Sequence, residues 1–155
     1  MRLLAIDTAL EACSAAVLDT TGGGIVAQVS LPMVRGHAEA LMPLVKRVMG
    51  ASRLAFAELD RIAVTVGPGS FTGLRVGIAA ARGIGLAAAR PVVGLTTLAA
   101  FAAPFIAEDE SLPVVVAIDA RHANVYLQVY GRAGRVLVAP RIASLHEAGL
   151  RAAAA

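Results

Sequence analysis

The stretch GPGSFTGLR, residues 67–75, decides the fold of this chain. It follows an apolar run at residues 62–66 and opens an Ala/Gly-rich segment that reaches about residue 89, so a strand, a tight turn and a long helix are expected in that order. The first N–H groups of a helix have no partner within it, so this turn could hold an anion. The glycines could instead serve close packing, because Gly73 and Gly77 are four residues apart and share one helix face. The choice between these two uses decides most of the functional question.

Length and composition limit the possible classes. The 155 residues suffice for one well-buried domain, or for one domain and part of another. The longest uncharged run, residues 91–107, is interrupted by proline, glycine and threonine and is too short for a membrane span. Only four apolar residues separate Arg2 from Asp7, too few for a signal peptide. We therefore expect a cytoplasmic protein that makes no membrane contact.

Cysteine and charge add two further expectations. The single cysteine, Cys13, excludes an internal disulfide, agrees with a reducing compartment and is expected to be a buried, inert thiol. The net charge is +3, and the 14 basic residues are scattered along the sequence and form no basic run. Because a nucleic-acid footprint is normally clustered on one face, any contact with RNA is expected to be indirect.

Hydrophobic periodicity predicts the element order β-β-β-α-β-α-β-α for residues 1–104. Three short strands come first, at residues 3–6, 13–18 and 25–31, and a helix that contains Pro43 follows them. The last helix of this part should end at about residue 103. Strands joined by tight turns pair antiparallel, whereas strands joined through helices pair parallel. The expected fold is therefore a mixed α/β sheet covered by helices.

Residues 105–155 repeat the opening pattern in part. The apolar strand at residues 114–118 ends on Asp119, as the first strand of the chain ends on Asp7. Further strands are expected at residues 125–130 and 136–138, with a short helix at the C-terminal end. This second lobe is either truncated, or its burial is completed by a partner chain.

Five motifs carry a resemblance to the bacterial TsaB (YeaZ) family. In chain order they are Leu4–Thr8 with Ser14 downstream, Gly36–Glu39 before Leu41–Pro43, the GPGSFTGLR stretch, Pro91–Leu98 and Ile118–Arg121. The resemblance covers residues 3 to about 131 and implies an actin/sugar-kinase/Hsp70-like (ribonuclease H-like) fold. It implies a first actin-like lobe at residues 1–104 and a partial second lobe at residues 105–155.

The same resemblance implies a non-catalytic scaffold and dimerisation subunit of the tRNA N6-threonylcarbamoyladenosine (t6A) transferase complex, which modifies adenosine 37 of ANN-decoding tRNAs. Its partners would be a TsaD-like catalytic paralogue and, in the assembled complex, a TsaE-like ATPase, and a homodimer is also open. ATP and a metal are then expected in the partner. The alternative is a self-sufficient sugar-kinase-like ATPase or phosphotransferase; an M22-type glycoprotease is less favoured.

No metal site and no catalytic residue are expected in this chain. TsaD-like proteins carry two histidines four residues apart on a helix, an arrangement that puts both rings on one face. Here Leu41 stands four residues after His37, and the other two histidines, His122 and His146, have no partner at ligand spacing. His37 is therefore interpreted as a helix-entry residue.

Nucleotide binding by the isolated chain is not expected either. If a nucleotide bound, it would use residues of the opening hairpin and of the glycine turn: Asp7, Thr8, Ser14, Gly67, Gly69 and Ser70. However, the hairpin turn has no glycine and places Glu11 where a phosphate would approach, and no glycine loop follows Asp119. The simpler interpretation is that Asp7 and Asp119 bond turn amides and that Ser70 caps a helix.

A partner interface is expected on two helices, because both look apolar over too much of their circumference for a solvated cover. Small residues every four positions from Gly73 to Gly85 let another backbone come close, whether from a partner or from the chain's own sheet. The residues predicted to face the partner are Leu41, Leu44, Val45, Val48, Leu74, Ile78 and Arg82.

Overall fold

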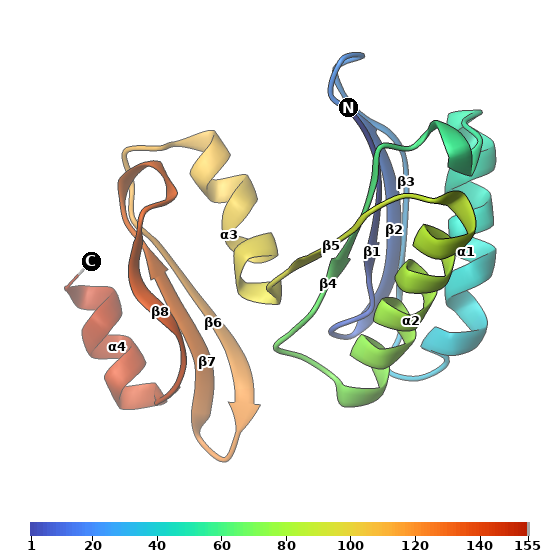
Figure 1. Ribbon diagram of the computed structural model, residues 1–155. Helices are drawn as coiled ribbons and strands as arrows, with labels where there is room; N and C mark the ends of the chain where they lie inside the picture. Colours follow the sequence, from blue (N-terminus) through green and yellow to red (C-terminus); the bar gives the residue numbers. More distant parts are fainter. Residues whose placement is uncertain (155) are drawn as a thin grey trace. The chain divides into compact units, whose positions relative to one another are not determined.

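In this computed structural model, which describes residues 1–154, a five-stranded mixed sheet forms the body of a first compact unit, residues 1–95 (Figure 1). The strands are β1 (Arg2–Asp7), β2 (Ala12–Asp19), β3 (Gly24–Pro32), β4 (Arg61–Thr65) and β5 (Val92–Leu95), in the spatial order β3-β2-β1-β4-β5. The β1–β2 and β2–β3 pairs are antiparallel, and the β1–β4 and β4–β5 pairs are parallel. The predicted mixed sheet is confirmed.

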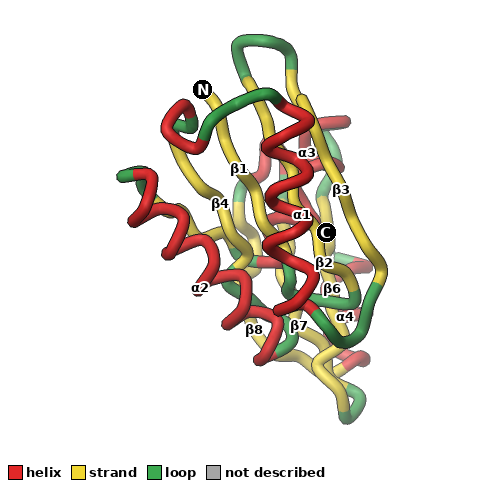
Figure 2. Tube along the Cα trace, turned by 90° about the vertical axis from the view of Figure 1, so that its right-hand side faces the viewer, coloured by secondary structure: helices red, strands yellow, loops and turns green. Residues whose placement is uncertain are grey.

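Two helices, α1 (His37–Ser52) and α2 (Phe71–Ala88), cover one face of this sheet, and the short turn η1 (Phe56–Glu58) lies between them in the sequence (Figures 1 and 2). Alternate residues of the strands point to that face, as the two-residue period of a strand requires. The largest fully buried side chains of this core include Leu4, Val17, Ile62, Leu41, Val45, Val48 and Leu59. Each such side chain contributes about 1.5–3 kcal/mol of hydrophobic stabilisation.

A residue in the left-handed conformation stands at each end of α1. Gly36 takes a left-handed conformation just before the helix, with φ of 89°. At the other end Arg53 is left-handed, and its N–H donates to the Gly50 carbonyl. Pro43 lies inside the helix, where its missing N–H costs one backbone hydrogen bond.

The second unit is a three-stranded antiparallel meander with one helix on each face. It contains α3 (Thr97–Glu108), β6 (Val114–Arg121), β7 (Asn124–Tyr130), the turn η2 (Arg132–Gly134), β8 (Val136–Ser144) and α4 (Leu145–Ala153). Val125, Leu127 and Val129 of β7 pack with Ala148 of α4. Tyr130 of β7 packs with Leu98 and Ala102 of α3. These two clusters lie on opposite faces of β7.

Three boundaries differ from those expected. The compact units divide after Leu95 instead of residue 104, because α3 packs on β6 and β7. Helix α3 continues through Pro104 to Glu108, and Ile106 beyond the proline packs into the core of this unit. Strand β8 runs to Ser144 instead of residue 138, because residues 141–144 keep pairing with β7. Pro140 is compatible with this pairing since β8 is an edge strand.

Within residues 1–154, no helix is both long and apolar enough to cross a membrane.

Candidate functional site

The GPGSFTGLR stretch packs against the turn between β1 and β2. The N–H of Ser70 donates to the Ala9 carbonyl at 2.7 Å. The buried Thr8 hydroxyl donates to the Gly73 carbonyl, also at 2.7 Å. Two hydrogen bonds therefore join the start of α2 to a turn about sixty residues earlier in the chain.

The glycines of this stretch are required by that packing. A Cβ atom on Gly69 would overlap the backbone carbonyl of Ala9, and one on Gly73 would overlap the carbonyl of Thr8. One helical turn later, a Cβ on Gly77 would overlap the Thr8 hydroxyl. Since carbonyl oxygens cannot rotate away like the end of a long side chain, only glycine fits at residues 69 and 73. Of the two uses that the sequence allows, the structure displays close packing.

Asp7, at the end of β1, is bonded to β4 and to the turn of the same hairpin. One oxygen of its carboxylate accepts hydrogen bonds from the Thr65 hydroxyl at 2.7 Å and from the Ala9 N–H at 2.9 Å. In the second unit, Asp119 accepts from the Arg121 N–H at 2.7 Å. Both aspartates bond turn amides, as the sequence interpretation holds.

The remaining nucleotide candidates are likewise engaged by the chain itself. The Ser14 hydroxyl is hydrogen-bonded to the Ser30 hydroxyl at 2.7 Å. Ser70 caps α2, because its hydroxyl accepts from the Gly73 N–H at 3.3 Å. Gly67 has φ of 111°, a backbone conformation that glycine adopts readily. The structure thus brings most of the candidate residues together at one end of the sheet, where they bond other residues of the chain.

His37 joins the start of α1 to this hairpin. Its ring is largely buried, and the Nε2 atom lies 3.2 Å from the Leu10 carbonyl. Among residues 1–154, the His, Cys, Asp and Glu side chains form no group of three that could hold a metal ion. Cys13 is buried in β2; burial, with a smaller effect from the Asp7 charge, raises the pKa of its thiol. A raised pKa disfavours the reactive thiolate.

The structure corrects the predicted interface at four positions. Leu41, Leu44, Val45 and Val48 are 0–4% exposed and belong to the core between α1 and the sheet. The periodic stripe on α1 is therefore the side that packs on the chain's own strands. On α2, Leu74 and Ile78 are half-buried, and Ile78 packs against the same core; Arg82 is exposed.

The exposed sides of the same two helices carry large apolar groups that the sequence reading missed. On α2, Phe71 is 68% exposed and Leu86 is 87% exposed. The Arg75 guanidinium lies over the Phe71 ring, 3.8 Å from its centre, and shields one side of it. The sequence pattern could have identified Phe71 and Leu86 as exposed, because they fall outside the stripe of glycines that marks the buried side of α2.

A groove of about 990 Å³ lies along α1 and the segment that follows it. Its lining includes Met42, Lys46, Met49, Arg53, Leu54 and Phe56. Met42 is 49% exposed and Phe56 is 36% exposed. We use the name outer face for the exposed residues Met42, Lys46, Arg47, Arg53, Phe71, Arg75, Arg82 and Leu86 on and next to α1 and α2.

The chain is similar in sequence to known proteins of tRNA threonylcarbamoyladenosine biosynthesis. A sequence model of the family described as TsaD, tRNA N6-adenosine threonylcarbamoyltransferase, matches residues 11–148. The tRNA threonylcarbamoyladenosine biosynthesis protein TsaB of Escherichia coli is 39% identical over 132 residues, which are 85% of this chain and 56% of that protein. The chain thus spans about half the length of the curated relatives that it matches.

Solved structures agree with these sequence matches. The structure of YeaZ from Pseudomonas aeruginosa matches with a TM-score of 0.78 and 36% identity, over 93% of this chain and 67% of that one. A ROK hexokinase from Thermus thermophilus matches with a TM-score of 0.52 and 21% identity, over 88% of this chain and 48% of that one. The hexokinase likeness shows the fold alone, which is that of the actin-like sugar kinases.

Proposed function

The chain belongs to the TsaB (YeaZ) family, and from this premise we propose that it is a non-catalytic accessory subunit in the biosynthesis of threonylcarbamoyladenosine on tRNA. The observation that carries the proposal is the packing of the GPGSFTGLR stretch. The start of a helix after a glycine turn is a common place for phosphate. Here that place is taken by the Thr8 and Ala9 backbone of the chain itself. The motif therefore supports a scaffold better than it supports an active site.

We infer that the chain alone binds no nucleotide, because the residues that would hold one already bond other groups of the chain. The Asp7 carboxylate already accepts two hydrogen bonds, and Ser14 and Ser70 are bonded to other groups of the chain. We accordingly assign no cofactor to this chain alone, and we place ATP and a metal in the partner.

In this proposal the outer face of α1 and α2 contacts a TsaD-like subunit. Exposed Phe71 and Leu86 offer apolar anchors there, and truncating a central anchor in a protein interface typically costs about 2 kcal/mol or more. A TsaE-like ATPase joins the assembled complex, and tRNA is contacted through the partner. The complex works in the cytoplasm.

The alternative, a self-sufficient sugar-kinase-like ATPase, has no better support. The likeness to the hexokinase stands at 21% identity and concerns the fold. A kinase lobe should bind nucleotide unaided, whereas Asp7 and Thr8 here are bonded to other residues of the chain.

Reconstitution tests the proposal. The chain is added to the TsaD-like protein of the same organism together with the remaining proteins of the pathway, and modified adenosine in tRNA is measured by nucleoside mass spectrometry. We expect no product from the chain alone, and faster formation when it joins the TsaD-like protein than when that protein acts without it. Equal rates with and without the chain, or product formed by the chain alone, would contradict the proposal.

A further inference from the structure

Strand β3 has a free outer edge. It is the first strand in the spatial order of its sheet, and among residues 1–154 no strand pairs with its outer side. Figure 2 shows β3 at the margin of the sheet. With nine residues it is also the longest of the five strands. A long free edge offers unpaired N–H and carbonyl groups to another strand.

The pairing of β3 with β2 shows which backbone groups point outward. The Met33 N–H donates to the Glu11 carbonyl, and the register between the strands stays regular from there back to Ala27. In an antiparallel pair, every second residue bonds the neighbouring strand, and the residues between them direct both backbone groups away from it. Gln28 and Ser30 therefore direct their N–H and carbonyl groups outward.

The side chains of this edge carry no charge. No charged residue occurs between Asp19 and Arg35, and on β3 Ile25 is 60% exposed and Leu31 is 40% exposed. Proteins commonly protect a free edge with charged side chains, proline or a bulge. Here Pro32 is the last residue of the strand, and the register shift lies near its beginning. The middle of β3 is therefore an unprotected edge.

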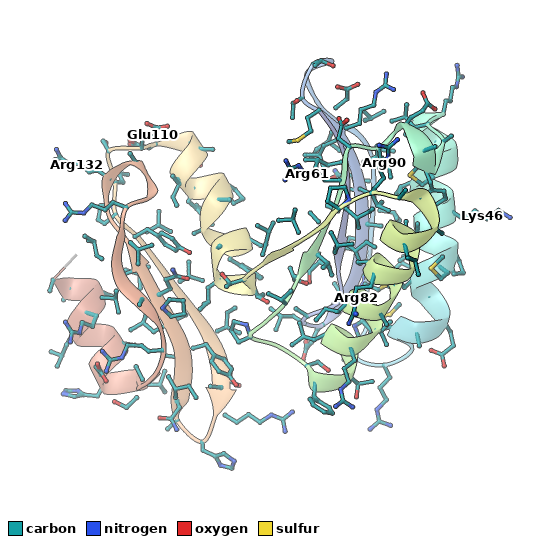
Figure 3. The ribbon with its side chains drawn as sticks, in the orientation of Figure 1. Lys46, Arg61, Arg82, Arg90, Glu110 and Arg132 are labelled. Atoms are coloured by element: carbon teal, nitrogen blue, oxygen red, sulfur yellow. The ribbon has the colours of Figure 1, made fainter. Side chains whose placement is uncertain are left out.

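Each of the other three sheet edges within residues 1–154 is short or carries charge. Strand β5 has four residues, and Arg61 and Arg90 lie near its N-terminal end (Figure 3). Strand β8 contains Pro140 and Arg141, and β6 contains Asp119. The long uncharged edge is thus particular to β3.

We propose that two copies of this chain pair antiparallel through β3, so that their five-stranded sheets join into one. Around a two-fold axis at Val29, Gln28 of each copy faces Ser30 of the other, and both residues use their outward N–H and carbonyl groups. On the side that the helices cover, Ala27 of one copy faces Leu31 of the other and covers part of its exposed side chain. Since β3 has one free side, the assembly closes at a dimer.

The composition of the edge favours a second copy over a different strand. A charged partner strand would find no charged side chain to recognise on β3. A second β3 brings an equally uncharged edge, so no like charges stand opposite each other. This inference goes beyond the proposed function, because it concerns an edge of the sheet and not the outer face of α1 and α2.

Sedimentation equilibrium of the full chain tests the pairing. We expect the wild type to form a reversible dimer, and Gln28→Lys to weaken dimerisation at least about tenfold, because it brings two positive charges together across the two-fold axis. The matched control, Ala107→Lys, adds the same charge at an exposed residue of α3 and should stay within about twofold of the wild type. Circular dichroism checks that both variants are folded.

Three results of this experiment would overturn the inference. The first is a wild type that is still monomeric at about 1 mM, a concentration at which even a small specific interface should be occupied. The second is a Gln28→Lys variant that dimerises as tightly as the wild type. The third is dimerisation that survives Gln28→Lys but is lost in Leu86→Asp, which would place the interface on α2.

Disulfide cross-linking tests the register of the pair. Opposite residues of a hydrogen-bonded antiparallel pair have Cα atoms about 5.5 Å apart, within the range of about 4.4–6.8 Å that a disulfide spans. A mixture of Gln28→Cys and Ser30→Cys chains should therefore yield several-fold more cross-linked dimer than either variant alone. Equal yields in all three samples would contradict the register, and no cross-linked dimer would contradict the pairing. Neither experiment contains the TsaD-like protein, so their outcomes are independent of the proposed function.

Discussion

Replacing Gly73 by alanine should destabilise this protein, although the same change in most helices does the opposite. Gly73 lies in the first turn of α2, where its backbone contacts the turn between β1 and β2. An added methyl group would overlap the Thr8 carbonyl oxygen. Because that atom belongs to the backbone, relief requires the helix or the hairpin to move.

The expected magnitude follows from three effects. Overpacking of this kind typically costs about 1–3 kcal/mol. Moving the helix also weakens the bond from the Thr8 hydroxyl to the Gly73 carbonyl, worth about 0.5–1.5 kcal/mol. The higher helix propensity of alanine offsets at most about 1 kcal/mol of this. The free energy of unfolding should therefore fall by about 2 kcal/mol.

Urea unfolding followed by far-ultraviolet circular dichroism measures this change. The matched control is Gly83→Ala on the same helix, where an added Cβ meets no atom within 4 Å. That variant should be more stable than wild type by up to about 1 kcal/mol. If both substitutions change the stability by the same amount and sign, the reasoning that Gly73 is a packing glycine is refuted.

Further predictions concern the core, the outer face and one surface carboxylate. Leu41→Ala should lower the free energy of unfolding by about 2–5 kcal/mol, because the Leu41 side chain is buried between α1 and the sheet. A loss below about 1 kcal/mol would contradict this burial. Leu86→Ala should change stability by no more than about 0.5 kcal/mol and should weaken binding of the TsaD-like protein in calorimetric titration; unchanged affinity would move the interface elsewhere. Hydrogen bonds from Thr21, with a smaller one from Arg2, lower the pKa of Asp19 to about 2. Asp19 therefore contributes stability that is fully present above its unfolded pKa of about 3.8 and is lost as pH falls through its folded pKa of about 2. Asp19→Asn should accordingly be less stable than wild type at pH 6, and the difference should shrink as pH falls to 2, as measured by urea unfolding at both pH values.

The fold could be predicted where local sequence rules determine it. The glycine turn after the apolar run at residues 62–66 marks the passage from β4 to α2. The order of strands and helices gives the mixed sheet, because tight turns and helical crossovers constrain how strands pair. The end of β8 was missed because Pro140 and Arg141 interrupt its alternation, and only pairing with β7 keeps residues 141–144 extended.

The candidate site was less predictable for a physical reason. Periodicity shows that α1 has a buried side, but not whether its own sheet or a partner covers that side. Leu41 and Val45 were therefore given to the partner, although they pack on the strands. The spacing of Gly73 and Gly77 likewise indicates that another part of the chain packs closely against α2, but it does not identify the atoms in contact. Those atoms belong to Thr8, about sixty-five residues earlier in the chain, and only the tertiary structure brings them together.

A thermal melt with and without millimolar Mg-ATP, performed on the chain alone and with the TsaD-like protein present, tests whether the glycine turn packs against the chain or holds phosphate. A ligand at a hundred times its dissociation constant stabilises a protein by about 2.7 kcal/mol. For a chain of this size that is a shift in Tm of roughly 5–10 °C. We expect no shift for the chain alone and a shift when the partner is present. A shift of several degrees for the isolated chain would contradict it, because the glycine turn would then hold phosphate instead of the Thr8–Ala9 backbone.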